Sequence, residues 1–148
     1  MVYPGQAEIV NQLVEIIRSL EIAPRRVLIV PGGNRYNLIA LMRKLAEQVN
    51  GHYIDHLADC LPQLSNFPLE AYKPFNLRDD LKEMLDKKDK PLIVGELEWV
   101  LAIWDESNQR RFFQSMATFT HKNVLVLMCR LPLDYETLIG DRSRVFRL

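Results

Sequence analysis

The sequence RRVLIVPGGNRYNLIALMRKLAEQ, from Arg25 to Gln48, reads as an apolar strand, a Gly-Gly turn and an amphipathic helix. This order is the frame of a phosphate loop, in which backbone N–H groups and a helix N-terminus face phosphate groups. The pattern GxxxxGK[ST] is absent, because its last three places hold Asn-Leu-Ile when counted from Gly32 and Leu-Ile-Ala when counted from Gly33. The frame is therefore predicted without the lysine that reaches a β/γ-phosphate or the hydroxyl that holds magnesium.

Strand and helix patterns alternate along the rest of the chain. Short all-apolar runs bounded by turns are typical of parallel strands buried on both faces, and apolar residues at three- and four-residue spacing indicate helices. The expected helices are Gln6–Leu20, Tyr36–Val49, Asn76–Asp86 and Ser107–Phe119, and the expected strands are Val27–Val30, one that starts at His52, one within Pro91–Val100, Asn123–Cys129 and a last short one within Arg144–Leu148. This alternation predicts a single domain over residues 1–148, an α/β three-layer P-loop NTPase-like domain with a mostly parallel, about five-stranded sheet.

Composition excludes several classes of protein. An apolar content of 48% and a charged content of 26% are those of a folded domain rather than a disordered chain. Lys+Arg equals Asp+Glu at 19 each, so bulk charge provides no general attraction to nucleic acid, and binding to DNA would need a local patch. The candidate patches are Arg25–Arg26, Arg110–Arg111 and the group Arg142, Arg144 and Arg147. Each such run is more often a solvated surface than a contact.

Nothing in the sequence indicates export or a membrane. The N-terminal MVYPGQAEIV lacks a basic segment followed by an apolar core, and no apolar run approaches the roughly 20 residues of a membrane helix. Cys60 and Cys129 match no zinc spacing, and we expect both to be reduced in the cytoplasm. His52, His56 and His121 form no recognisable ligand set either, so no metal site is predicted.

The carboxyl ends of parallel strands share one edge of a sheet, and ligands bind there. This rule brings together Pro31–Asn37, Gly95–Glu98 and Cys129–Pro132. The candidate cofactor-binding residues are Gly32, Gly33, Asn34, Arg35, Tyr36 and Asn37. Glycines permit close approach of the backbone to a phosphate, and Arg35 could supply a cation in place of the missing lysine. A tight strand-to-helix turn, with an asparagine that caps the helix, explains the same residues without any ligand.

Glu96, Glu98 and Arg130 are the candidate catalytic residues, because they follow two of the other predicted strands. In an ATPase, acidic groups at a strand end hold magnesium through water or polarise the attacking water. If the strand continued past Gly95, the two glutamates would lie on the same side of it. Arg130 could contact a γ-phosphate or pair with Glu96. Exposed carboxylates and a structural ion pair would give the same sequence pattern.

With these residues identified, the chain resembles the BrxF family, the small P-loop proteins of type 3 BREX bacteriophage-exclusion systems. The resemblance is one of layout over nearly the whole chain, in VLIV with a Gly turn and LMRKLAEQ, then LIVGELEWVLAIWDESNQRRFFQSM, HKN and VLVLMCRLP. It implies an ATPase-type fold, a cytoplasmic bacterial setting, and partners such as a larger defence-system ATPase or a DNA methyltransferase subunit. The family pattern has GK[ST] in the loop and an Asp at the strand end, where this chain has Asn-Leu-Ile and Gly95. Glu98 fits the acidic position that follows.

Three functions are consistent with these residues. The favoured one is an accessory subunit of a BREX-like phage-defence system, in which the degenerate phosphate loop leaves the protein to act through partners or as a homo-oligomer. Trp99 and Trp104 would anchor an interface if they are exposed. The second is an active small ATPase that uses ATP with magnesium through Arg35 and the two glutamates. The third is a DNA-binding adaptor that uses the arginine patches. In the favoured case we expect an anion-sized hollow at the turn, unless Arg35 or Tyr36 fills it.

Overall fold

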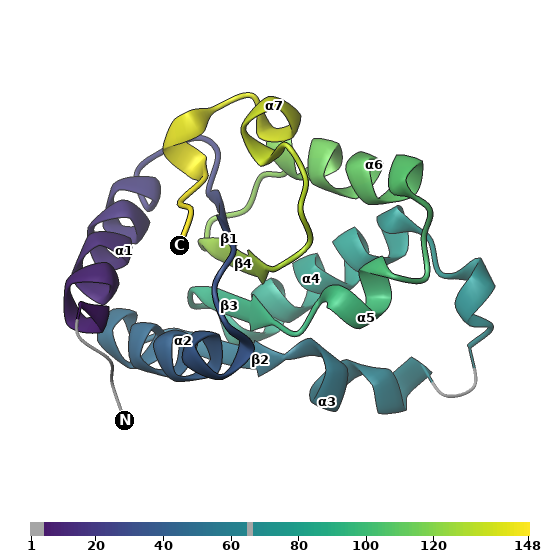
Figure 1. The fold of residues 1–148 in the computed structure, drawn as a ribbon, viewed down its shortest axis with the longest axis horizontal. Helices are drawn as coiled ribbons and strands as arrows, with labels where there is room; N and C mark the ends of the chain where they lie inside the picture. Colours follow the sequence, from purple (N-terminus) through teal and green to yellow (C-terminus); the bar gives the residue numbers. More distant parts are fainter. Residues whose placement is uncertain (1–4, 65–66) are drawn as a thin grey trace.

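The computed structural model describes residues 5–64 and 67–148, and for residues 35 and 36 it describes the backbone alone. The helices are α1 (Gln6–Leu20), α2 (Arg35–Val49), α3 (His56–Cys60), α4 (Pro74–Lys88), α5 (Glu98–Leu101), α6 (Glu106–Ala117) and α7 (Tyr135–Ile139), and the strands are β1 (Val27–Pro31), β2 (His52–Asp55), β3 (Leu92–Gly95) and β4 (Leu125–Cys129). The strands form one sheet in the order β1-β4-β3-β2, and every neighbouring pair is parallel (Figure 1).

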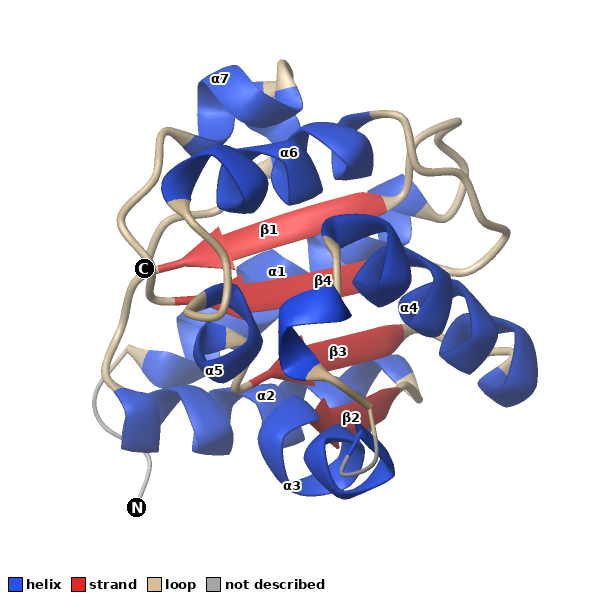
Figure 2. Ribbon diagram, turned by 90° about the vertical axis from the view of Figure 1, so that its right-hand side faces the viewer, coloured by secondary structure: helices blue, strands red, loops and turns tan. Residues whose placement is uncertain are grey.

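Helices cover both faces of this sheet. Side chains alternate along β1, so that Leu28 and Val30 join one apolar cluster while Val27 and Ile29 join the other. The first cluster also contains α1 and α2, and the second contains α4, α5, α6 and α7 (Figure 2). β1, β3 and β4 are buried along their whole length, as expected for parallel strands that are covered on both sides. The prediction of an α/β domain built on a parallel sheet is therefore confirmed.

Local signals set the ends of the long helices. The Asp105 carboxylate accepts a hydrogen bond from the Asn108 N–H at 2.9 Å and so caps the start of α6. α2 ends where Asn50 takes the left-handed conformation, with φ of 52°, and the Gly51 N–H donates to the Ala46 carbonyl at 2.8 Å. The Asn-Gly pair ends α2, as the sequence predicts. Helix α1 also has its predicted bounds, Gln6–Leu20.

The structure fixes where two expected strands end. The strand expected within Pro91–Val100 ends at Gly95, because Glu96 turns into the left-handed region with φ of 58° and helix α5 begins two residues later. The strand therefore does not continue past Gly95, and the two glutamates do not lie on the same side of a strand. The strand that starts at His52 ends at Asp55, whose carboxylate accepts the Ala58 N–H at 3.0 Å and begins α3.

The C-terminal segment lies beside β1 without forming a regular fifth strand. Val145 makes a single parallel bridge with Ile29. The Phe146 N–H donates to the Ile29 carbonyl at 2.9 Å, and the Leu148 N–H donates to the Pro31 carbonyl at 3.0 Å. Because β4 already pairs with β1, this segment occupies the other edge of the strand. Within the described residues the sheet thus has four strands, and residues 146–148 extend its hydrogen bonding beyond the free edge of β1.

The two tryptophans lie inside the fold rather than on an open surface. Trp104 is only 7% exposed, and its indole N–H donates to the Tyr72 carbonyl at 2.7 Å. Trp99 is half-buried and donates to Nδ1 of His56 at 3.0 Å. Trp104 is therefore a core residue, and the interface role that depended on its exposure does not apply to it. Among the helices of the described residues, none is both long and apolar enough to span a membrane.

Candidate functional site at the carboxyl edge of the sheet

Three strand ends meet at one edge of the sheet. β1, β4 and β3 are parallel neighbours, and the Gly32 N–H just after β1 donates to the Cys129 carbonyl at the end of β4, at 3.0 Å. The chain leaves β1 for α2 on one face and leaves β4 for α7 on the other (Figure 2). The ends of β1 and β4 thus flank a topological switch point, where α/β proteins bind ligands. The predicted common rim is confirmed.

The Gly-Gly turn is closely covered by the chain's own C-terminal segment. Gly32 and Gly33 both have positive φ, 96° and 86°, so the turn uses the freedom that only glycine has at no steric cost. A Cβ atom built on Gly32 would lie 3.2 Å from the Leu148 carbonyl oxygen. One built on Gly33 would lie 3.1 Å from Cδ1 of Leu148 and 2.8 Å from Cδ2 of Leu38. Leu148 therefore occupies space next to the turn, where the sequence predicted an anion-sized hollow.

The other predicted cofactor-binding residues surround this turn. The Asn34 carbonyl accepts the Leu38 N–H at 2.8 Å and so forms part of the first turn of α2. The Asn37 carbonyl accepts the side-chain amide of Gln6 at 3.4 Å, which links α2 to α1. The side chains of Arg35 and Tyr36, on which the predicted closing of the turn depended, lie outside the described part of the structure.

At the end of β3, the side chain of Met42 lies against Gly95. A Cβ atom built on Gly95 would lie 2.5 Å from Cε and 2.7 Å from Sδ of Met42, a buried residue of α2. Real Cβ atoms do not come this close to a neighbour, because repulsion rises steeply inside about 3.5 Å. An aspartate at this strand end would therefore require the flexible end of the Met42 side chain to move aside. In this structure that space holds Met42, where the family pattern has an acidic residue.

Glu98 and Arg130 form an ion pair across the rim. Oε1 of Glu98 accepts hydrogen bonds from the backbone N–H of Arg130 at 2.7 Å and from its Nε at 3.2 Å. This contact joins the first residue of α5 to the residue just after β4. The carboxylate that Arg130 contacts is thus Glu98, whereas the sequence suggested Glu96. Both side chains remain partly exposed, about a third of each, so the pair is a surface contact.

Two titratable groups near the rim are held neutral by burial. Burial raises the pKa of the Cys129 thiol to about 11, and the Tyr135 hydroxyl donates to its sulfur at 3.3 Å. Burial lowers the pKa of His56 to about 4, and Nδ1 of its ring accepts the Trp99 indole N–H. A neutral thiol is a poor nucleophile. Both cysteines are free, and no three His, Cys, Asp or Glu side chains within residues 5–64 and 67–148 lie close enough to share a metal ion.

The residues described at this rim lack several groups of a magnesium–nucleotide site. The places of the lysine and the Ser/Thr in GxxxxGK[ST] hold apolar residues, and the end of β3 is a glycine covered by Met42. Leu148 lies against the glycine turn, and Glu98 is bound by Arg130.

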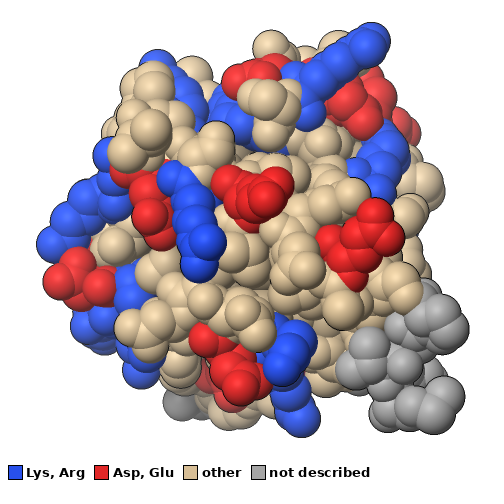
Figure 3. Space-filling view, turned by 90° about the vertical axis from the view of Figure 1, so that its left-hand side faces the viewer, with Lys and Arg blue, Asp and Glu red and all other residues tan. Residues whose placement is uncertain are grey.

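The arginines of the predicted DNA patches mostly hold the fold together. Arg25 donates to the Thr118 carbonyl at 3.1 Å, and Arg147 donates to Glu136 at 2.7 Å. Arg144 is only 4% exposed and donates to the carbonyls of Ala117 and Ile139. Arg26 donates to the Ala23 carbonyl, and Arg110 pairs with the Asp134 carboxylate. On the face that carries α1, basic and acidic side chains are interspersed (Figure 3). These patches do not form a continuous basic surface there.

Two hollows that the sequence does not predict lie away from this rim. One, of about 510 Å³, lies between α4 and α6, and the other, of about 750 Å³, lies beside β2 and α4. Each is lined by residues that are far apart in the sequence and meet only through packing of helices. The Arg110–Arg111 run was the only sequence feature that pointed toward the first hollow, since Arg111 lines it.

Comparison with known proteins does not identify a family for this chain. No protein family model matches this chain, and comparison with curated proteins gives no match.

Proposed function

We propose that this protein is an accessory subunit with a P-loop NTPase-like fold, which acts through protein partners or self-assembly rather than by turning over nucleotide. Following the resemblance to the BrxF family, the proposed setting is a BREX-like bacterial defence system. The proposed partner is a larger ATPase or a methyltransferase subunit of the same system.

The arrangement of the chain supports the fold part of this proposal. A glycine turn connects β1 to α2, as in a phosphate loop, and the parallel sheet has helices on both faces. The hydrogen bonds of Phe146 and Leu148 to β1 support a fifth, irregular strand at that edge. A frame of this kind can persist as a scaffold after its catalytic groups are lost, because function depends on the site and not on the fold.

The observation that carries the proposal is the contact of Leu148 with the glycine turn. Cβ atoms built on Gly32 and Gly33 would lie 3.2 and 3.1 Å from atoms of Leu148, so this residue lies where a phosphate would approach the backbone. Met42 lies against Gly95, and Glu98 pairs with Arg130. The glycine turn, the strand end and Glu98 therefore each make a contact within the protein.

The first test is nucleotide turnover and binding. We expect the purified protein to release no phosphate from ATP above buffer in the presence of magnesium, and calorimetry at millimolar ATP to show no binding. Glu98→Gln should leave this baseline unchanged, as should Glu8→Gln, a matched change at an exposed position of α1. Turnover by the parent protein that disappears in Glu98→Gln but persists in Glu8→Gln would make the protein an active ATPase and would refute the proposal.

The second test is association. We expect affinity purification of the tagged protein from a host that carries the neighbouring defence genes to retain a larger ATPase or a methyltransferase subunit. Light scattering on the purified protein measures self-assembly separately. A protein that stays monomeric and retains no defence component would contradict the proposed role.

A further inference from the structure

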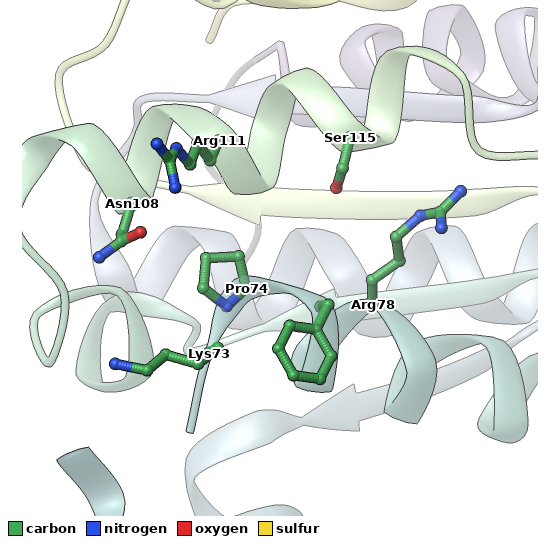
Figure 4. A pocket seen from close by; sticks show the side chains of 7 residues that line it. Lys73, Pro74, Arg78, Asn108, Arg111 and Ser115 are labelled. Carbon is green, nitrogen blue, oxygen red and sulfur yellow. The ribbon is translucent and has the colours of Figure 1, made fainter. Parts of the chain in front are cut away.

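A hollow of about 510 Å³ lies between the first turns of α4 and the outer side of α6. It is lined by Lys73, Pro74, Phe75 and Arg78 from the start of α4, and by Asn108, Arg111 and Ser115 from α6 (Figure 4). We call it the α4–α6 pocket. Its volume falls in the range of about 300–1,000 Å³ that is usual for ligand sites. It is separate from the glycine turn and shares no residue with the rim described above.

Three cations line this pocket, and within residues 5–64 and 67–148 none of them is paired with a carboxylate. They are Lys73, Arg78 and Arg111, and they differ in this respect from Arg110, Arg144 and Arg147, which contact Asp134, Asp141 and Glu136. The nearest acidic residue along α6 is Glu106, which does not line the pocket, and Asp105 before it caps that helix through the Asn108 N–H. The pocket therefore has a local excess of positive charge in a protein whose net charge is zero.

Arg78 carries an unused donor at the wall of the pocket. Its Nε is buried and has no hydrogen-bond partner, while its guanidinium lies 5.4 Å from the centre of the Phe119 ring. Buried polar atoms in folded proteins are nearly always hydrogen-bonded, so a lone buried N–H beside a hollow indicates a missing acceptor. Guanidinium groups favour phosphate as that acceptor, because their planar donors match its oxygens.

Phe75 supplies an aromatic surface next to these cations. Its side chain is 62% exposed, although it is one of the largest apolar side chains in the protein, and Pro74 precedes it at the start of α4. An exposed aromatic ring flanked by cations is the combination on which single-stranded nucleic acids bind, since bases stack on the ring and phosphates contact the cations. The flat ring accepts any base, so this recognition is tolerant of sequence.

The geometry points to a single-stranded nucleic acid as the occupant of the α4–α6 pocket, with a base against Phe75 and successive phosphates at Lys73, Arg78 and Arg111. Arg78 lies across the pocket from Lys73 and Arg111, with Pro74 between them (Figure 4). Cations spread around the pocket in this way suit the repeated phosphates of a strand. This inference concerns a different surface from the rim and does not rest on the proposed function.

The test is fluorescence anisotropy with a labelled single-stranded oligonucleotide of roughly 10 nucleotides. We expect binding at low salt. The logarithm of the association constant should fall linearly with the logarithm of the salt concentration, with a slope of about −2, which is roughly −0.7 for each of three phosphate contacts. Phe75→Ala should weaken binding roughly 5- to 150-fold through the lost stacking. Because Phe75 is largely exposed, this variant keeps the core, which circular dichroism verifies. Arg111→Gln should weaken binding and make the salt slope about 0.7 shallower.

Arg110→Gln is the matched control. It removes the same charge from the next residue of α6, but Arg110 contacts Asp134 and does not line the pocket, so binding should stay close to that of the parent. Absence of strand binding, equal loss in Arg110→Gln and Arg111→Gln, or unchanged binding in Phe75→Ala would overturn the inference. So would equally tight binding of a duplex, or displacement of the strand by an equal concentration of nucleoside triphosphate or acidic peptide. None of these measurements involves ATP turnover or defence partners, so their outcome is independent of the tests above.

Discussion

The contact between Met42 and Gly95 can be tested by a double-mutant cycle. In Gly95→Ala the new methyl group would lie 2.5 Å from Cε of Met42, far inside the contact distance of about 3.5–4.0 Å. Forcing an extra methyl group into a packed core costs about 1–3 kcal/mol. Replacing glycine by alanine also restricts the unfolded chain, which offsets about 0.4–1 kcal/mol of that cost. These ranges leave a net cost between about 0 and 2.6 kcal/mol. Because Cε and Sδ are the flexible end of Met42, we expect Gly95→Ala to lower the free energy of unfolding by about 1 kcal/mol.

The companion variant removes the other side of the contact. Met42 is buried, so Met42→Ala should lower the free energy of unfolding by about 2–5 kcal/mol through the cavity it leaves. In the double variant the methyl group added by Gly95→Ala has room and fills part of this cavity. The combined loss should then be smaller than the sum of the single losses by about 1 kcal/mol or more.

Urea unfolding followed by circular dichroism measures all four proteins. The slope of the transition should stay constant, so that differences in midpoint report stability alone. Losses that add to within about 0.3–0.5 kcal/mol would show that Met42 and Gly95 are not coupled. A Gly95→Ala variant as stable as the parent would show that the end of Met42 moves aside at no net cost, so that this contact would not oppose an acidic residue at the strand end.

Three further predictions concern stability. Burial lowers the pKa of His56 from 6.5 to about 4, so the unfolded state binds the proton first as pH falls. The contribution of His56 to the free energy of unfolding is therefore complete above pH 6.5. Below this pH it is lost by about 1.4 kcal/mol per pH unit, down to about pH 4. The same pH titration of unfolding should be flatter in His56→Leu, and an equally steep profile would contradict this assignment. Arg144→Met should lower the free energy of unfolding by about 1–3 kcal/mol, because it leaves the carbonyls of Ala117 and Ile139 without their donor. The control Arg142→Met, at an exposed position, should change the free energy of unfolding by less than about 0.5 kcal/mol. Similar urea midpoints for these two variants would refute the structural role of Arg144. Trp104→Phe should lose about 1–3 kcal/mol because the Tyr72 carbonyl loses its buried donor, and thermal unfolding unchanged by this substitution would count against that hydrogen bond.

Periodicity predicted most of the fold because the chain's long elements have strong patterns. Helix α1 and strand β1 lie where their apolar spacing places them, and the rim shared by β1, β3 and β4 follows from the rule for parallel strands. The break at Gly95 was not predicted, since VGELEWVL is apolar enough to read as strand or helix, and only the left-handed Glu96 separates them. Short helices such as α7 are too brief to give a periodic pattern.

The details of the candidate site depended on contacts between distant residues. The sequence places a glycine at position 95, but it does not reveal that Met42, from another element, fills the space beside it. The pairing of Arg130 with Glu98 rather than Glu96 follows from the turn at Glu96, which sequence periodicity cannot detect. The α4–α6 pocket joins residues 73–78 to residues 108–115, and no motif connects these two segments.

The position of β1 in the sheet also bears on how the protein is made. This strand, Val27–Pro31, is synthesised early and is apolar throughout, yet both of its neighbours come late, β4 at residues 125–129 and the flanking segment at residues 145–148. At about 5–20 residues per second, a ribosome needs roughly 5–20 s to deliver the roughly 100 residues in between. During that interval β1 has two unpaired edges and only helical partners to shield it. A nascent chain of this protein is therefore exposed to aggregation until β4 is made, and a chaperone that binds extended apolar segments would find its target at β1.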